Sequence, residues 1–95
     1  MGEGMSLFRL AAKRDANENV LVDCLRSLGF NVTRTSGRGL PDLILSRRRV
    51  FHLAEVKGRY GKYTPAQVTF KAHHSAPVYR LETLDDCLAL SKAAP

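Results

Sequence analysis

The sequence predicts an α/β fold in which a mixed sheet is flanked by helices, in the element order αβββαβα. Three observations predict it. Short apolar runs rich in β-branched residues occupy the middle of the chain, apolar residues recur at helical spacing before and after them, and glycine or proline separates most of these segments. A chain of 95 residues with 44% hydrophobic residues is long enough for one globular domain. We therefore expect residues 1–14 to form an N-terminal arm and residues 15–95 a single domain.

The first helix is predicted to begin near Asp15. This residue is a favourable N-cap, and Glu18 three residues later can complete a capping box. The apolar positions that follow are spaced for one helical face: Leu21, Cys24, Leu25 and Leu28. Gly29 is placed to end the helix, and residues 30–35 then indicate a strand.

Residues 41–57 predict a β-hairpin. Strands over 41–46 and 50–57 are joined by an arginine-rich turn, and a pairing of Ser46 with Phe51 closes it. In this register Asp42 lies directly opposite Glu55, where cross-strand Cβ atoms are about 4.5–5.5 Å apart. Alternation along the second strand places Lys57 on the same face as Glu55. Two carboxylates and one ammonium therefore converge on one site.

The C-terminal third predicts a helix, a strand and a second helix. Thr64, Pro65 and Gln67 form a strong helix start, with a cap, a proline at the first helical position and a glutamine that can close a capping box. This helix should run to about residue 74. Residues 77–81 indicate a short strand, and Thr83 caps a final helix whose apolar positions are Leu84, Cys87 and Leu88.

The charge distribution indicates a polyphosphate partner. The formal net charge is +6, and between Arg34 and Lys71 nine lysine or arginine residues accompany only two acidic ones, Asp42 and Glu55. Such a basic segment is typical of nucleic-acid binding. Two carboxylates at its centre would repel each other, so we expect a divalent cation, Mg²⁺ or Mn²⁺, between them. The residues expected to contact nucleic acid are Arg34, Arg38, Arg47, Arg48, Arg49, Arg59, Tyr60, Lys62, Tyr63 and Lys71.

Four elements in sequence order resemble the PD-(D/E)XK nuclease superfamily: helical Glu18, Pro41-Asp42, Glu55-Val56-Lys57, and Gln67 at the start of the next helix. Within it, the small size, the run from Gly39 to Leu43 and the glutamine after the lysine resemble the stand-alone VRR-NUC domains of phages and bacteria. The resemblance covers residues 15–90. It implies a restriction-endonuclease-like core, metal-dependent phosphodiester hydrolysis, a relation to Holliday-junction resolvases, and often a homodimer that acts on two strands.

The chemistry of phosphodiester hydrolysis gives each residue an expected role. Asp42 and Glu55 would bind the cation directly, with the Val56 carbonyl as a third ligand. Glu18 would bind through water or complete a second metal position. Lys57 would orient the attacking hydroxide and stabilise the transition state, and Gln67 would position Lys57 or the scissile phosphate.

Several of these residues have a purely structural alternative. Glu18 and Gln67 can serve as capping-box residues and nothing more. Asp42 can be a turn residue after proline. Glu55 and Lys57 could mark an exposed strand edge, although their apolar neighbours favour a central strand.

The flanking basic and aromatic residues have alternatives too. The three arginines at 47–49 could simply solubilise a tight turn, and the two tyrosines could pack against the protein rather than stack on unpaired bases. A zinc site built from His52, His73 and His74 is disfavoured, because His52 points to the opposite face from Glu55 and adjacent histidines on a helix diverge.

We interpret the chain as a metal-dependent, structure-selective DNA endonuclease that acts on branched DNA as a homodimer. The chief alternative is a catalytically silent nuclease-fold protein that binds nucleic acid, and a third is a small dimeric interaction partner. There is no apolar run near the length of a bilayer span and no apolar signal-peptide core, so we expect a cytoplasmic protein of a bacterium or phage-infected cell, with no membrane partner. Cys24 and Cys87 are expected to be reduced core residues.

Overall fold

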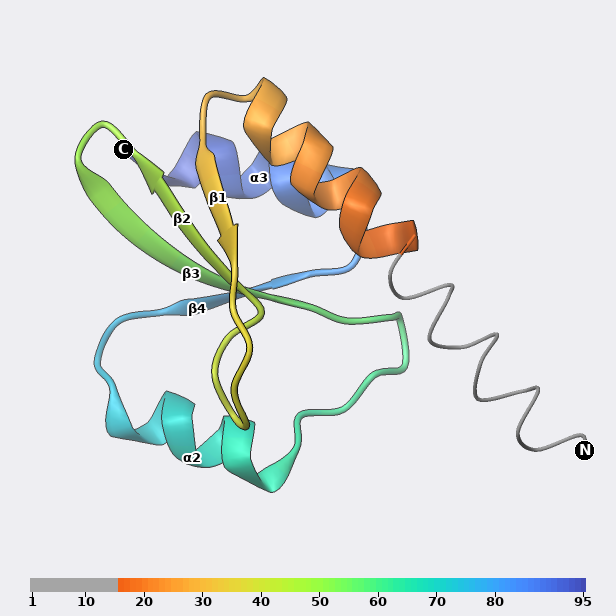
Figure 1. Cartoon of the computed structure of the whole chain (residues 1–95), viewed down its shortest axis with the longest axis vertical. Coiled ribbons are helices and arrows are strands. Elements are labelled where there is room, and N and C mark those ends of the chain that lie inside the picture. The colour runs from red at the N-terminus through yellow and green to blue at the C-terminus, as the bar shows by residue number, and fades with distance from the viewer. Residues whose placement is uncertain (1–15) are drawn as a thin grey trace, which may run out of the picture.

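The computed structural model describes residues 16–95 of the chain. Within this part it is an α/β fold with a four-stranded mixed sheet and three helices (Figure 1). The first helix covers residues 16–27. The elements that follow are β1 (Asn31–Arg34), β2 (Leu43–Arg47), β3 (Val50–Val56), α2 (Pro65–His73), β4 (Val78–Leu81) and α3 (Leu84–Ala93). This order matches the predicted αβββαβα, whereas the predicted N-terminal arm and the Asp15 cap lie outside the described residues.

The helix ends follow local capping chemistry. Thr64 Oγ1 accepts from the Gln67 backbone N–H, and Gln67 Oε1 accepts from the Thr64 N–H, which confirms the predicted capping box at α2. Thr83 and Asp86 form the same arrangement at the start of α3. Gly29 follows the 16–27 helix with a φ of +94°, a left-handed conformation that favours glycine at a helix end.

The sheet has the strand order β1-β2-β3-β4, with antiparallel pairs except for the parallel pair β3–β4. The parallel pair is possible because α2 lies in the connection that carries the chain back along the sheet. The predicted hairpin register is confirmed, with Ser46 opposite Phe51 and Ile44 opposite Leu53. The pairing continues to Arg47 and Val50, one pair beyond the predicted end, and this leaves a two-residue turn.

The turn of the β2–β3 hairpin consists of Arg48 and Arg49, whose φ angles are 53° and 68°. Two consecutive positive φ angles in a two-residue loop are the conformation of a type I′ turn. Asparagine and glycine adopt it most readily, so arginine at both positions is a local conflict between residue and backbone.

The hydrophobic core lies between one face of the sheet and two helices, the 16–27 helix and α3, which lie together on the same side of the molecule (Figure 1). Its fully buried members include Leu21 and Leu25 from the first helix, Leu43 and Leu45 from β2, Ala54 from β3, Leu81 from β4, and Cys87 and Leu90 from α3. Cys24 and Cys87 are both free, as expected for reduced core residues, and burial raises the pKa of the Cys87 thiol to about 11. No helix within residues 16–95 is long and apolar enough to cross a membrane.

Arg47 ties the two core helices to the end of the sheet. Its guanidinium group lies 4.1 Å from the centre of the Phe30 ring. The guanidinium donates to five acceptors near the C-terminal ends of these helices: Leu28 O, Ser91 Oγ, Ser91 O, Ala94 O and Pro95 O. Carbonyl groups at a helix end have no partner within the helix, and a cation there also opposes the negative end of the helix dipole. Arg47 is therefore a structural residue.

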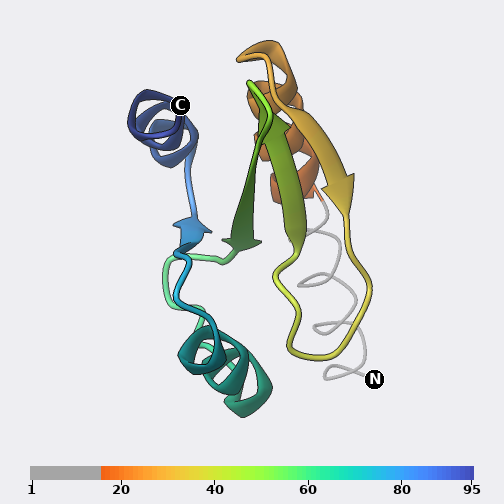
Figure 2. The same ribbon diagram turned by 90° about the vertical axis from the view of Figure 1, so that its left-hand side faces the viewer.

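The remaining helix, α2, lies apart from the other two at the opposite end of the molecule (Figure 1). Figure 2 shows the same separation from the side, with the loop between β1 and β2 extending toward that end. Side chains alternate along β3, so Phe51, Glu55 and Lys57 lie on the face away from the core. Exposure falls along this row from 76% at Phe51 to 0% at Glu55 and 6% at Lys57. The side chains buried near α2 are therefore polar, namely Glu55, Lys57 and Gln67, in contrast to the apolar core.

Candidate active site

The central residue of this polar interior is Glu55. Its side chain is fully buried, and within the described residues neither Oε1 nor Oε2 has a hydrogen-bond partner. Burial raises the pKa of Glu55 above its ordinary value of 4.5, and the charge of Asp42 acts in the same direction. The positive charges of Lys71, Lys57 and Arg80 oppose this shift. A buried carboxylate with two unsatisfied oxygens is costly, because each buried acceptor without a partner loses about 1–3 kcal/mol of solvation.

Asp42 is positioned by the loop that precedes β2. Thr35 holds this loop, since its N–H donates to the Asp42 backbone carbonyl over 2.9 Å and its hydroxyl donates to the Pro41 carbonyl. Asp42 Oδ2 accepts from the Val56 N–H over 2.8 Å, so the carboxylate lies beside the peptide that joins Glu55 to Val56. The structure therefore brings the two predicted carboxylates to the same end of the hairpin.

Lys57 is buried next to them and is held by two oxygens. Its Nζ donates to Gln67 Oε1 over 2.7 Å and to the Lys62 carbonyl over 3.3 Å. The same Gln67 oxygen accepts from Thr64 N–H over 3.0 Å. The two interpretations of Gln67 are therefore compatible, because one side chain closes the capping box and also contacts the predicted site lysine.

Tyr63 packs among the cations of the site. Lys71 Nζ lies 3.7 Å from its ring centre, Lys57 Nζ 5.5 Å and Arg80 Cζ 5.3 Å. Cations at such distances are attracted to the negative face of an aromatic ring. Tyr63 thus matches the packed alternative, whereas Tyr60 is 84% exposed with the Arg59 guanidinium 5.5 Å from its ring centre.

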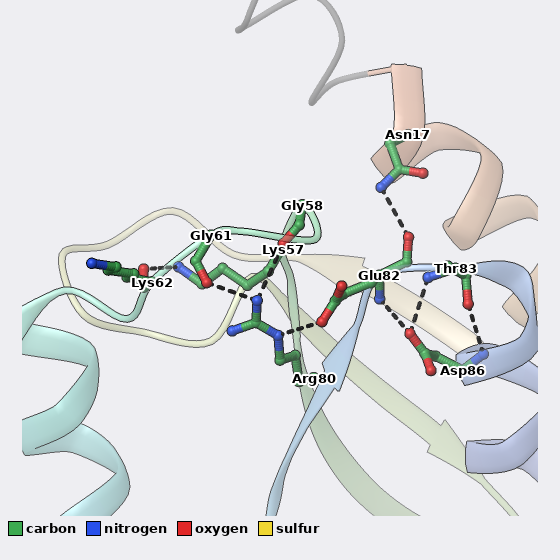
Figure 3. Close-up of polar contacts among 9 residues, drawn as sticks. All are labelled: Asn17, Lys57, Gly58, Gly61, Lys62, Arg80, Glu82, Thr83 and Asp86. Atoms are coloured by element: carbon green, nitrogen blue, oxygen red, sulfur yellow. Dashed lines mark hydrogen bonds and ion pairs between the residues drawn. The ribbon is translucent and has the colours of Figure 1, made fainter.

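Arg80 is a site residue that the sequence analysis missed. The parallel pairing of β4 with β3 places it opposite Glu55. Figure 3 shows its guanidinium holding the loop after β3, with bonds of 3.2 Å to the Gly58 carbonyl and 2.7 Å to the Gly61 carbonyl. Its Nε pairs with Glu82 Oε2 over 2.8 Å. An arginine inside an otherwise apolar strand was the available signal, but its partner depends on a parallel register that residue periodicity does not give.

The predicted helical glutamate has a different neighbour. Arg34 Nε lies 3.8 Å from Glu18 Oε2, and Arg34 also donates to Asn19 Oδ1. Glu18 is not among the charges that shift the pKa of Glu55. Within residues 16–95 no three histidine, cysteine, aspartate or glutamate side chains are grouped to hold a metal ion. Asp42 and Glu55 thus lie at the same end of the hairpin, while Glu18 is paired with Arg34 of β1.

The predicted basic segment is divided between the two ends of the hairpin. Arg48 and Arg49 are exposed in the turn, at the end of the strands away from Asp42 and Glu55. Arg47 uses its donors within the protein, so its guanidinium is not available for the predicted contact with nucleic acid. The basic side chains of the loops and helix at the Glu55 end are Arg38, Lys57, Arg59, Lys62 and Lys71. His52 lies on the core face, with its ring 6.1 Å from Phe30 and 6.2 Å from Tyr79, as its predicted orientation required.

The donor set fits a divalent cation that prefers oxygen ligands. Carboxylate oxygens are the ligands of Mg²⁺ and Mn²⁺, and Glu55 offers two that no described protein group satisfies. The lysines at 57 and 71 act on Glu55 through their charge but donate no hydrogen bond to it. Asp42 and Glu55 would hold the cation, and the Val56 carbonyl remains a predicted third ligand.

No protein-family model matches the chain, and comparisons with curated proteins and with solved structures found no significant match.

Proposed function

We propose that the chain is a metal-dependent endonuclease that hydrolyses phosphodiester bonds in branched or otherwise structured DNA. The observation that supports this most strongly is the fully buried Glu55 carboxylate, which has no hydrogen-bond partner in the described chain although Asp42 lies beside it. A carboxylate kept for stability alone would be paired or solvated. A cation with oxygen ligands would offset the cost of burying the unpaired Glu55 carboxylate. The basic residues around it would then bind the phosphates of a substrate.

The chain's own groups would divide the work as follows. Asp42 and Glu55 would hold Mg²⁺ or Mn²⁺, which supplies Lewis-acid stabilisation of charge on the phosphoryl oxygens and lowers the pKa of a water nucleophile. The Lys57 ammonium would orient the attacking water and stabilise the developing negative charge. Gln67 Oε1 would keep that ammonium in place, because it accepts from Nζ over 2.7 Å.

The positive groups around the site would bind the strand. Lys71, Arg59 and Lys62 lie on the loop and helix that flank Lys57 and would neutralise phosphates. Tyr60, which is exposed on the same loop, would contact an unpaired base.

The wider arrangement is consistent with a restriction-endonuclease-like core of the VRR-NUC type. The element order is αβββαβα, with Asp42 before the second strand and Glu55-Val56-Lys57 at the end of the third. We further propose a cytoplasmic homodimer that acts on two strands, as the resemblance implies. Sedimentation equilibrium at micromolar concentration tests the dimer, and a monomer at every concentration would contradict it.

The decisive experiment compares cleavage and binding in matched variants. Purified protein is incubated with a four-way junction, a flap and a linear duplex in Mn²⁺, and products are resolved on denaturing gels. Lys57→Met should reduce cleavage by about 10²–10³-fold, the usual loss when one transition-state donor is removed. Lys92→Met removes an exposed charge on α3 and should cleave like the wild type.

Two outcomes would contradict the nuclease. Equal cleavage by wild type and Lys57→Met would point to a contaminating enzyme. Salt-sensitive DNA binding without cleavage, across Mg²⁺, Mn²⁺ and all three substrates, would support the catalytically silent binding protein instead.

A further inference from the structure

A depression beside the candidate site has no role in the function proposed so far. It has a volume of about 330 Å³ and lies between α2 and the loop that joins β1 to β2. Its main lining residues are Arg38, Gly39, Thr69, Phe70, His73 and His74. This volume is at the small end of ligand-binding pockets, so it suits one nucleotide-sized group.

Both walls of the depression continue directly into the candidate site. The loop wall leads within three residues from Gly39 to Asp42, and the helix wall includes Ala66, the neighbour of Gln67. The walls touch at Gly39, where a Cβ atom would lie 2.9 Å from both the Ala66 carbonyl oxygen and the Ala66 Cβ. Gly39 also has a φ of +81°, so glycine is required there for both reasons. A group bound in the depression would therefore lie next to the metal-binding carboxylates.

The lining combines an aromatic surface with a cation and hydrogen-bonding groups. The rings of Phe70 and His74 have centroids 4.4 Å apart and are inclined by 39°, and His73 lies beside them with its ring 5.8 Å from that of His74. Aromatic rings stack on any nucleobase, and imidazole nitrogens can bond to its edge. Arg38 is exposed on the opposite wall and can pair with a phosphate. A nucleotide carries the same three features: a flat ring, polar edges and a phosphate.

We propose that this depression binds one unpaired nucleotide adjacent to the scissile phosphate, with its base against Phe70 and its phosphate against Arg38. This inference rests on the proposed nuclease function and names its substrate class: a strand with a base free to leave the duplex, as at a flap or junction. A base stacked within a continuous duplex could not enter, so the depression would select structured DNA.

The test measures binding in EDTA, so that it is independent of cleavage. A gapped duplex is prepared with one abasic nucleotide placed in turn at each unpaired position, and affinities are measured by fluorescence anisotropy. At one position the abasic change should weaken wild-type binding by about tenfold, the usual contribution of one base stacked on an aromatic side chain. Phe70→Leu should bind the intact strand about tenfold more weakly and lose nearly all sensitivity to that abasic position.

Matched variants provide the controls. Phe51→Leu makes the same change on an exposed phenylalanine near the far turn of the hairpin and should keep the wild-type abasic profile. Arg38→Ala should lower affinity and the salt dependence of binding more than Lys92→Ala does. If the Phe70 variant fails to fold, a flat abasic profile of the wild type still overturns the proposal.

The outcomes separate this proposal from the nuclease itself. Equal abasic sensitivity in wild type and Phe70→Leu, or the same flat profile at every position, would overturn the subsite even if the protein cleaves DNA. A loss of affinity at one abasic position that disappears in Phe70→Leu, measured in EDTA, would support the depression as a nucleotide-binding pocket. If the protein then cleaves no DNA in Mn²⁺, the pocket stands and the nuclease is rejected.

Discussion

The two ends of the β2–β3 hairpin each carry a charged side chain that is at least partly buried, but only one of the two has hydrogen-bond partners. Near the turn, the Arg47 guanidinium donates to five acceptors and also packs on Phe30. At the other end, the Glu55 carboxylate accepts no hydrogen bond from any described residue, although it is fully buried. The Arg47 guanidinium therefore finds its hydrogen-bond partners within the protein, whereas the Glu55 carboxylate finds none among the described residues. The contrast distinguishes a charge that the protein itself satisfies from one that our proposal assigns to a bound cation.

The largest expected effect on stability is at the Arg47 end of the hairpin. Arg47→Met should lower the free energy of unfolding by about 2–4 kcal/mol, because it leaves several helix-end carbonyls without a donor. Urea denaturation followed by circular dichroism measures this loss. Arg48→Met removes the same charge one residue away, from an exposed position, and should have little effect. If the two substitutions cost the same, Arg47 is not the structural residue described here.

At the Glu55 end of the hairpin, a substitution is expected to raise the free energy of unfolding instead of lowering it. Glu55→Gln should raise the unfolding free energy of the metal-free protein by roughly 1 kcal/mol, since it removes a buried charge. Asp23→Asn, an exposed change on the 16–27 helix, is the matched control. Mg²⁺ or Mn²⁺ should raise the melting temperature of the wild type and of Asp23→Asn, but not that of Glu55→Gln. A metal response retained in Glu55→Gln would remove Glu55 from the metal site.

The stabilisation by Glu55→Gln should depend on pH. Because the pKa of Glu55 is raised in the folded protein above its ordinary value of 4.5, the folded state holds this proton more tightly than the unfolded state does. The resulting stability is present below that value and is lost as pH rises through the folded-state pKa. The difference between variant and wild type in EDTA should therefore increase with pH across this window. A difference that shrinks with rising pH would show that the carboxylate is stabilised, not destabilised, by folding.

The smallest predicted effect concerns the turn itself. The double substitution Arg48→Asn and Arg49→Gly should stabilise the protein by about 0.5–1 kcal/mol, because these residues adopt the two positive φ angles more easily. Chemical denaturation is again the measurement. The substitution should leave metal-dependent stabilisation unchanged, since the turn lies at the far end of the hairpin from Asp42. Destabilisation would mean that the arginine side chains make contacts that outweigh the backbone preference.

The features that the sequence predicted well are those set by local chemistry. The capping box at Thr64 and the register of Ser46 with Phe51 depend on residues a few positions apart, and both were confirmed. The roles of Arg47 and Arg80 were missed because they depend on distant partners. Arg47 contacts carbonyls up to 48 positions away, and Arg80 meets Glu55 only through a parallel pairing. Neither contact produces a periodic pattern in the amino-acid sequence.

The predicted site residues also divide into those placed by local chemistry and those that depend on distant parts of the chain. Asp42, Glu55 and Lys57 are joined by one hairpin, so alternation and register were enough to predict that they gather. Gln67 follows from the helix start that its own capping box defines. Glu18 belongs to a separate helix, whose rotation against the sheet residue patterns do not determine, and its side chain pairs with Arg34.

The single amide oxygen of Gln67 links two equilibria that are usually independent. It accepts both from the Thr64 N–H and from the Lys57 ammonium. Fraying of the first turn of α2 would carry this oxygen away and leave the Lys57 ammonium with the Lys62 carbonyl, at 3.3 Å, as its remaining acceptor. Ordering of a few residues at the start of one helix therefore tightens the placement of a positive charge beside Glu55, and the lysine becomes less well fixed at temperatures where that turn melts.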